Sequence, residues 1–152
     1  MLSDDLCVIY WRACPRSFIS LMTLYESNYI RFGWLAPEPS RITQRAVSRV
    51  AGDCTLELTV VERARYTTTL ALSYLFKEGA RELREPGLRV RLYHDARLAE
   101  ATGIGAVARH PAPRRVEARL GGATDDSWSR NVLLNKWLEY CAERGHRFVA
   151  AA

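Results

Sequence analysis

Residues 54–62, 66–76 and 88–93 each alternate between apolar and polar side chains, and this period of two constrains the fold more than any other feature. Successive side chains of a strand point to opposite faces of the sheet, so this alternation predicts strands that each bury one face. The connections between these segments are too short for parallel crossovers and therefore predict an antiparallel meander. A weaker strand is expected over residues 42–51, followed by a hairpin turn at residues 52–53.

The apolar positions of these strands define the predicted core. We expect the following residues to be buried: Leu56, Leu58, Val60, Leu70, Leu72, Val90 and Leu92. Residues 77–87 are mostly charged and end in a Pro-Gly pair, which predicts a loop. Residues 102–123 carry several glycines, prolines and arginines and are predicted to be mostly irregular, with a short element at residues 116–120.

The two ends of the chain have a helical period instead. Apolar residues at three- and four-residue spacing predict helices over residues 17–32 and 127–144. Ser17 is suited to begin the first helix, and Gly33 and Gly145 are predicted to end the two helices. The first apolar stripe comprises Phe18, Leu21, Met22, Tyr25, Tyr29 and Phe32. From the second helix we expect the sheet to be faced by Leu133, Trp137 and Leu138.

The order of helix, strands and helix predicts an α+β fold. We expect an antiparallel meander of three to five strands packed on N- and C-terminal helices, with both helices on one face of the sheet. At 100° per residue, Glu26 and Asn28 fall on opposite borders of the first apolar stripe, so both are expected at its rim.

Composition restricts the functional classes. A chain of 152 residues is expected to form one domain. Its net charge of +5 comes from 20 Arg and 2 Lys interleaved with 17 acids, so we do not interpret the charge alone as a nucleic-acid signal. The basic cluster at residues 109–119 is predicted to be a solvated loop. The apolar run at residues 6–11 is too short to span a bilayer, and we expect a cytoplasmic protein with no membrane partner. The four cysteines lack metal or redox spacing and are expected to be free thiols.

Four stretches of the chain resemble a bacterial family of unknown function, the YqiB-like proteins. They are Glu26 to Tyr29, Val61 to Thr68, Val90 to Ala96 with Ala99-Glu100 behind it, and Asn131 to Cys141 followed by Gly145. The resemblance covers about residues 16 to 146 and implies a small cytoplasmic protein without a known activity. It leaves residues 1–15 as an N-terminal extension ahead of a single α+β domain at residues 16–148. Ahead of the last helix the family pattern has Lys and Gln, whereas this chain has Ser127 and Ser129.

His94 and Asp95 are the only adjacent histidine–carboxylate pair in the chain. In a hydrolase or lyase such a pair would act in acid–base catalysis, with the carboxylate orienting the imidazole. The simpler interpretation is a histidine at a strand end and an aspartate that begins a turn. No two histidines have metal-ligand spacing, and neither a metal nor a cofactor is predicted.

The ends of two predicted strands carry polar, basic and aromatic residues that suit an anionic or stacking ligand. We predict the following ligand-binding residues: Glu62, Arg65, Tyr66, Thr67, Arg91 and Tyr93. If their strands are neighbours, these side chains would share the outward face of the sheet, where a nucleotide or nucleic acid could bind. An ordinary solvent-facing sheet has the same pattern. The first hypothesis is therefore a binding or regulatory module. One alternative is a hydrolase or lyase that uses His94 and Asp95. The other is a protein–protein interaction module, such as a homodimer formed through a sheet edge.

Overall fold

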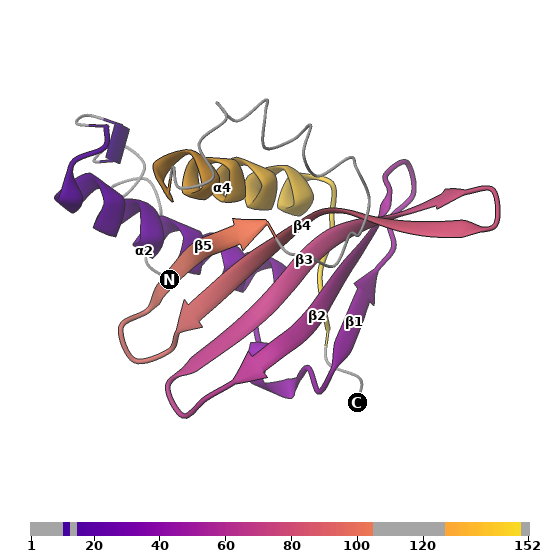
Figure 1. Ribbon diagram of the computed structural model, residues 1–152, viewed down its shortest axis with the longest axis horizontal. Coiled ribbons are helices and arrows are strands. Elements are labelled where there is room, and N and C mark those ends of the chain that lie inside the picture. The colour runs from indigo at the N-terminus through magenta and orange to yellow at the C-terminus, as the bar shows by residue number, and fades with distance from the viewer. Residues whose placement is uncertain (1–10, 13–14, 105–126, 150–152) are drawn as a thin grey trace.

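The computed structural model describes residues 11–12, 15–104 and 127–149 of the chain. Its elements, in chain order, are α2 (Phe18–Leu35), the 3-10 helix η1 (Pro39–Arg41), β1 (Arg45–Ser48), β2 (Thr55–Arg63), β3 (Thr67–Glu78), β4 (Arg81–Tyr93), β5 (Leu98–Ile104) and α4 (Ser127–Glu143). The strands form one antiparallel sheet in the order β1-β2-β3-β4-β5. Helices α2 and α4 lie together on one side of that sheet (Figure 1). The predicted α+β class and the meander are confirmed.

The core lies between the two helices and the inner face of the sheet. Phe32 and Leu35 of α2 and Leu134, Leu138 and Cys141 of α4 meet the apolar side chains of the strands. Every strand residue predicted to be buried belongs to this core or packs against it, although Val60 is only partly buried. Each strand is held in register because a slip by one residue would turn its apolar set toward solvent.

The first helix begins as predicted, but its C-terminal end and its buried face differ from the prediction. Ser17 does cap it, because its Oγ accepts a hydrogen bond from the Ser20 amide. Gly33 does not end it, since the helix continues to Leu35 and stops ahead of Pro37. Phe18, predicted to be part of the apolar stripe, is 74% exposed. The face that α2 buries is rotated from the predicted stripe because it packs on α4 and β5 as well as on the apolar core.

The buried face of α2 includes Asn28, which is fully buried rather than at the rim. Glu26 is exposed, as expected. In α4, Trp137 and Leu138 join the core as predicted, whereas Leu133 is only partly buried and Leu134 takes the inward position. The helix ends ahead of Gly145, whose φ of 89° is the left-handed conformation that glycine adopts most easily.

Residues 77–87 are not the predicted loop. Strand β3 continues to Glu78 and β4 begins at Arg81, so the turn contains only Gly79 and Ala80. The end of this hairpin extends beyond β2 and projects from the body of the sheet (Figure 1). Such a ribbon has solvent on both faces and needs no apolar alternation, which is why its sequence resembles a loop.

Strand β5 was not predicted, because residues 98–104 carry small residues and a glycine instead of β-branched alternation. The expected strand at residues 42–51 is shorter than predicted and covers Arg45–Ser48. The expected element at residues 116–120, the basic cluster at residues 109–119 and most of the predicted N-terminal extension lie outside the described residues.

Candidate functional site

The outer face of β2, β3 and β4 brings together four of the six predicted ligand-binding residues, Glu62, Thr67, Arg91 and Tyr93. Thr67 pairs with Tyr93 and Thr69 pairs with Arg91, as expected if these strands were neighbours. Glu62 of β2 lies directly opposite Thr69 on the β2 side of strand β3. Directly opposed residues share one face of a sheet, so these side chains are neighbours on the side away from the core.

One cross-strand row of this face runs through four strands. Its members are Glu62, Thr69, Arg91 and Glu100, from β2 to β5. The Arg91 Nε donates a hydrogen bond of 3.4 Å to the Thr69 Oγ1. Within the described residues, Arg91 forms no ion pair, and besides Thr69 its guanidinium interacts with the Tyr93 hydroxyl.

Arg89 extends the basic character of this face along β4. It lies opposite Ala71, two residues before Arg91 and therefore on the same face. Its Nε is buried without a hydrogen-bond partner. Because that nitrogen is covered by protein atoms, a ligand could reach only other atoms of this partly buried side chain.

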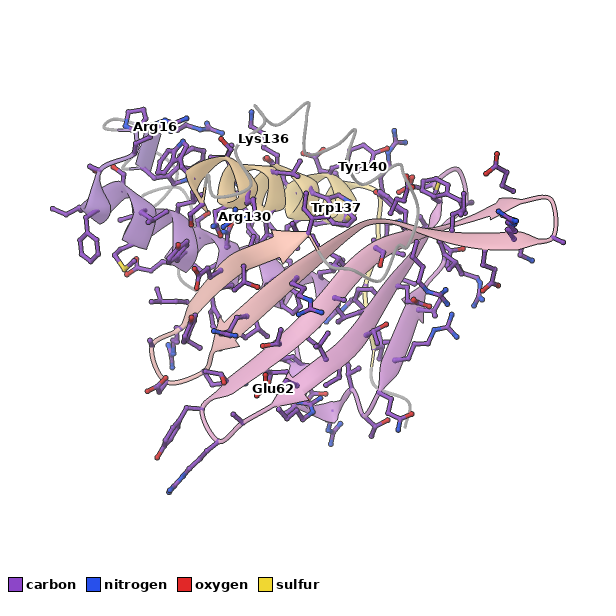
Figure 2. The ribbon with its side chains drawn as sticks, in the orientation of Figure 1. Arg16, Glu62, Arg130, Lys136, Trp137 and Tyr140 are labelled. Carbon is purple, nitrogen blue, oxygen red and sulfur yellow. The ribbon has the colours of Figure 1, made fainter. Side chains whose placement is uncertain are left out.

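Arg65 and Tyr66 lie in the connection between β2 and β3, at the end of the sheet (Figure 1). Both are exposed, and the Arg65 guanidinium carbon lies 5.2 Å from the centre of the Tyr66 ring. Figure 2 shows Glu62 near this end of the sheet and Trp137 and Tyr140 on α4. Arg65 and Tyr66 therefore lie beside the outer-face row of Glu62, Thr69, Arg91 and Glu100 and are not part of it.

His94 and Asp95 each contact a different partner. The His94 Nε2 lies 2.7 Å from the Thr68 Oγ1, and Thr68 is buried on the same face as the core residue Leu92. His94 therefore lies on the face opposite Arg91. Asp95 accepts a hydrogen bond from the amide of Ala96 and so shapes its own turn. Catalysis by His94 stays a prediction that these contacts do not favour.

A second polar cluster, which the sequence did not reveal, surrounds His146 in the segment that follows α4. The His146 Nδ1 lies 3.0 Å from the Ser48 Oγ, and its Nε2 lies 2.9 Å from the Asp53 Oδ2. The cluster is buried, and the Ser48 Oγ also accepts a hydrogen bond from the amide of Arg147. Because Ser48 is buried and its Oγ already accepts this hydrogen bond, it is poorly suited to act as a nucleophile. The cluster instead joins the segment after α4 to β1 and the β1–β2 turn.

Burial and hydrogen bonding shift the pKa values around this cluster. Burial opposes ionisation of Asp53, but the hydrogen bonds from His146 and the Cys54 amide hold its pKa below the ordinary value. Burial raises the pKa of the Cys141 thiol to about 11, and burial likewise raises the pKa of Tyr74. Cys141 is therefore a protonated, buried thiol. The partners of His146 lie 93 and 98 residues away in the sequence, so no local pattern could have identified them.

A third set of polar residues lies where α2, α4 and β5 meet. The Asn135 Nδ2 donates to the Asn28 Oδ1, and the Asn28 Nδ2 donates to the Asn131 Oδ1. Asn131 in turn accepts from the amide of Ala101 at 2.7 Å. The Asn28 Nδ2 also lies 3.4 Å from the Ala99 carbonyl oxygen. These contacts occupy polar backbone groups along the edge of β5, where the hypothesis of dimerisation through a sheet edge would need them open.

The described residues contain neither a metal cluster nor a membrane-spanning helix. Within them, no group of three or more His, Cys, Asp or Glu side chains could hold a metal ion. None of the described helices is long and apolar enough to cross a membrane.

Comparison with known proteins finds relatives without an assigned function. The family described as "Protein of unknown function (DUF1249)" matches residues 31–147. The chain is 29% identical over 128 residues to "Uncharacterized protein YqiB" of Escherichia coli strain K12, covering 84% of this chain and 90% of the relative. The proteins of the same name from the O6:H1 and O157:H7 strains match to the same extent. No solved structure matches the chain.

Proposed function

Because this chain belongs to the DUF1249 family, whose description assigns no activity, we propose a function from the site itself: a binding module for an anionic ligand, a nucleotide or a nucleic acid. The observation that carries the proposal is the register of β3 and β4. It sets Arg91 beside Thr69 and Tyr93 beside Thr67 on the sheet face away from the helices. A guanidinium, hydroxyls and an aromatic ring are the groups with which sheet surfaces hold phosphates and bases.

Arg91 is the residue best placed to contact a phosphate. Its planar guanidinium offers several donors, of which Nε is bonded to Thr69. That bond orients the side chain across the sheet and reduces the entropy lost on binding. Arg89, two residues away on the same face, adds a second positive charge along the strand.

Other residues of the surface favour a ligand that carries a base. The rings of Tyr66 and Tyr93 offer stacking surfaces, and Tyr66 is 54% exposed. The exposed carboxylate of Glu62 can accept a hydrogen bond from an exocyclic amino group, as acidic side chains do with cytosine. Inorganic phosphate would use neither group and is expected to bind more weakly than a nucleotide.

Fluorescence anisotropy with a labelled deoxycytidine oligonucleotide tests the proposal. We expect Arg91→Ala to weaken binding at least about tenfold, because it removes charge-assisted hydrogen bonds. The dependence of affinity on salt should also become shallower, since fewer counterions are released. Unlabelled ATP and pyrophosphate, added as competitors, separate a nucleotide site from a site for longer nucleic acid.

Arg81→Ala is the matched control. Arg81 is exposed at the tip of the β3–β4 hairpin. Its removal therefore changes the net charge by the same amount as Arg91→Ala but leaves the proposed binding surface around Arg91 unchanged. The proposal fails if the wild-type protein binds none of these probes at low salt. It also fails if Arg81→Ala weakens binding as much as Arg91→Ala.

We place this binding in the cytoplasm, where nucleotides and nucleic acids are abundant. Cys54 and Cys141 are free thiols, which suits a reducing compartment.

A further inference from the structure

Arg91 and Glu100 lie directly opposite one another on β4 and β5 but form no ion pair. Side chains in this relation have Cβ atoms about 4.5–5.5 Å apart, close enough for an arginine and a glutamate to meet. In the described part of the chain, Arg91 instead donates to Thr69 and interacts with the Tyr93 hydroxyl, and Glu100 accepts from two tyrosines. The proposed anion-binding surface thus has the Glu100 carboxylate beside Arg91, its main cation, yet the two charges do not form an ion pair.

Each oxygen of the Glu100 carboxylate is engaged by a tyrosine hydroxyl. The Tyr93 Oη donates to Oε2 at 2.9 Å, and the Tyr25 Oη donates to Oε1 at 3.4 Å. Tyr25 belongs to α2, is buried, and has its Oη 3.2 Å from the Ser127 Oγ of α4. Burial and the hydrogen bond to Glu100 raise the pKa of Tyr93 and outweigh the opposing effect of Arg91, so its hydroxyl remains a donor. The carboxylate is therefore held between a strand and the helical layer.

We propose that the tyrosine hydroxyls hold Glu100 away from Arg91 and thereby set the affinity of the outer face for anions. The inference rests on the proposed function, since it concerns the same surface. Without the Tyr93 hydroxyl, the carboxylate can turn toward Arg91. It would then compete with any ligand anion, and an intramolecular competitor acts at a high effective concentration. Glu100 and Tyr25 are positioning residues in this arrangement.

Three variants measured with the labelled deoxycytidine oligonucleotide test the inference. Tyr93→Phe keeps the ring and removes only the hydroxyl, and we expect it to weaken binding about fivefold, the size of a partly exposed ion pair. Glu100→Gln should tighten binding. The double variant Tyr93→Phe/Glu100→Gln should bind like Glu100→Gln alone, because an uncharged amide cannot compete for Arg91. Tyr25→Phe should weaken binding in the same direction without altering any group that faces the ligand.

Tyr140→Phe is the control, since Tyr140 is exposed on α4 and away from this surface. Thermal unfolding of each variant verifies that it is folded. The inference is overturned if Tyr93→Phe weakens binding equally in the Glu100→Gln background, because the hydroxyl would then contact the ligand itself. It is also overturned if Arg91→Ala weakens binding while Tyr93→Phe and Tyr25→Phe do not, and in that case the proposed function stands. A wild-type protein that binds no probe removes both.

Discussion

At the scale of single residues, Glu57 is an acid buried on the sheet face away from both helices. It is 2% exposed, and its Oε1 accepts a hydrogen bond of 2.6 Å from the Arg84 Nε. The Arg45 Nε donates to its other oxygen. Burial by itself would raise the pKa of Glu57, but the hydrogen bonds from Arg84 and Arg45 outweigh it and lower the pKa from the usual 4.5. Three strands are joined by this one carboxylate.

Glu57→Gln is expected to lower the free energy of unfolding at neutral pH by about 1–3 kcal/mol, because two charge-assisted hydrogen bonds are weakened. A group with a lowered pKa in the folded state stabilises the fold above its unfolded pKa. That stabilisation is lost as the pH falls through the folded value. Urea unfolding from neutral to acidic pH should therefore show a shallower pH dependence for the variant than for the wild type.

Glu38→Gln provides the comparison, since the ion pair of Glu38 with Arg41 is exposed and such pairs contribute little. If Glu57→Gln unfolds at the same urea concentration as Glu38→Gln, the two arginines do not stabilise the sheet through Glu57.

At the scale of elements, Asn131 is where α4 is attached to both α2 and β5. Its Oδ1 accepts from the amide of Ala101 and from Asn28, and its Nδ2 donates to the Ser127 carbonyl oxygen at 2.7 Å. Asn131 is fully buried. These hydrogen bonds fix the rotation and the translation of α4 relative to α2 and β5, because any other position would leave buried polar groups without a partner.

Asn131→Ala should destabilise the protein by roughly 1–3 kcal/mol for each buried group left unpaired. Hydrogen exchange gives a local readout, and the amide of Ala101 should lose protection in the variant before the amides of the central strand β3 do. Lys136→Ala, an exposed change on the same helix, controls for helix propensity. Unchanged exchange at Ala101 would contradict the role assigned to Asn131.

At the scale of the whole molecule, the segment after α4 packs against both the end of α2 and the β1 side of the sheet. His146 lies between β1 and the β1–β2 turn, and Phe148 is buried in the core. The amide of Phe148 donates to the carbonyl oxygen of Leu35 at the end of α2. A few residues thus connect the two helices to the edge of the sheet distant from β5.

Asp53→Asn should loosen this segment. At neutral pH we expect lower stability than in the wild type, because His146 loses an ionised acceptor. The difference should narrow as the pH falls through the lowered pKa of Asp53, where the wild-type carboxyl also becomes neutral. Limited digestion with carboxypeptidase should remove the segment faster from the variant at neutral pH. Glu143→Gln, exposed at the end of α4, is the control, and equal digestion of the two variants would contradict the prediction.

The sequence by itself determined the features that depend on neighbours along the chain. Alternation over β2, over β3 as far as Phe76 and over β4 from Leu88 identified these strands and their buried face, and the short connections between them allowed only antiparallel pairing. Ser17 and Gly145 marked two helix ends, because caps are formed within a single turn. The same alternation was enough to assign Arg91 and Tyr93 to the face of β4 opposite the core.

Tertiary structure alone decided which distant side chains meet. Asn28 was expected at the rim of an apolar stripe and is buried, because α4 and β5 supply the hydrogen bonds that make its burial tolerable. His146 finds its partners in β1 and the β1–β2 turn, and Glu100 is held by a tyrosine from α2. Burying a polar group stabilises a fold only where a partner waits at hydrogen-bond distance. That distance is set by the packing of whole elements, so a pattern of neighbours along the chain cannot predict it.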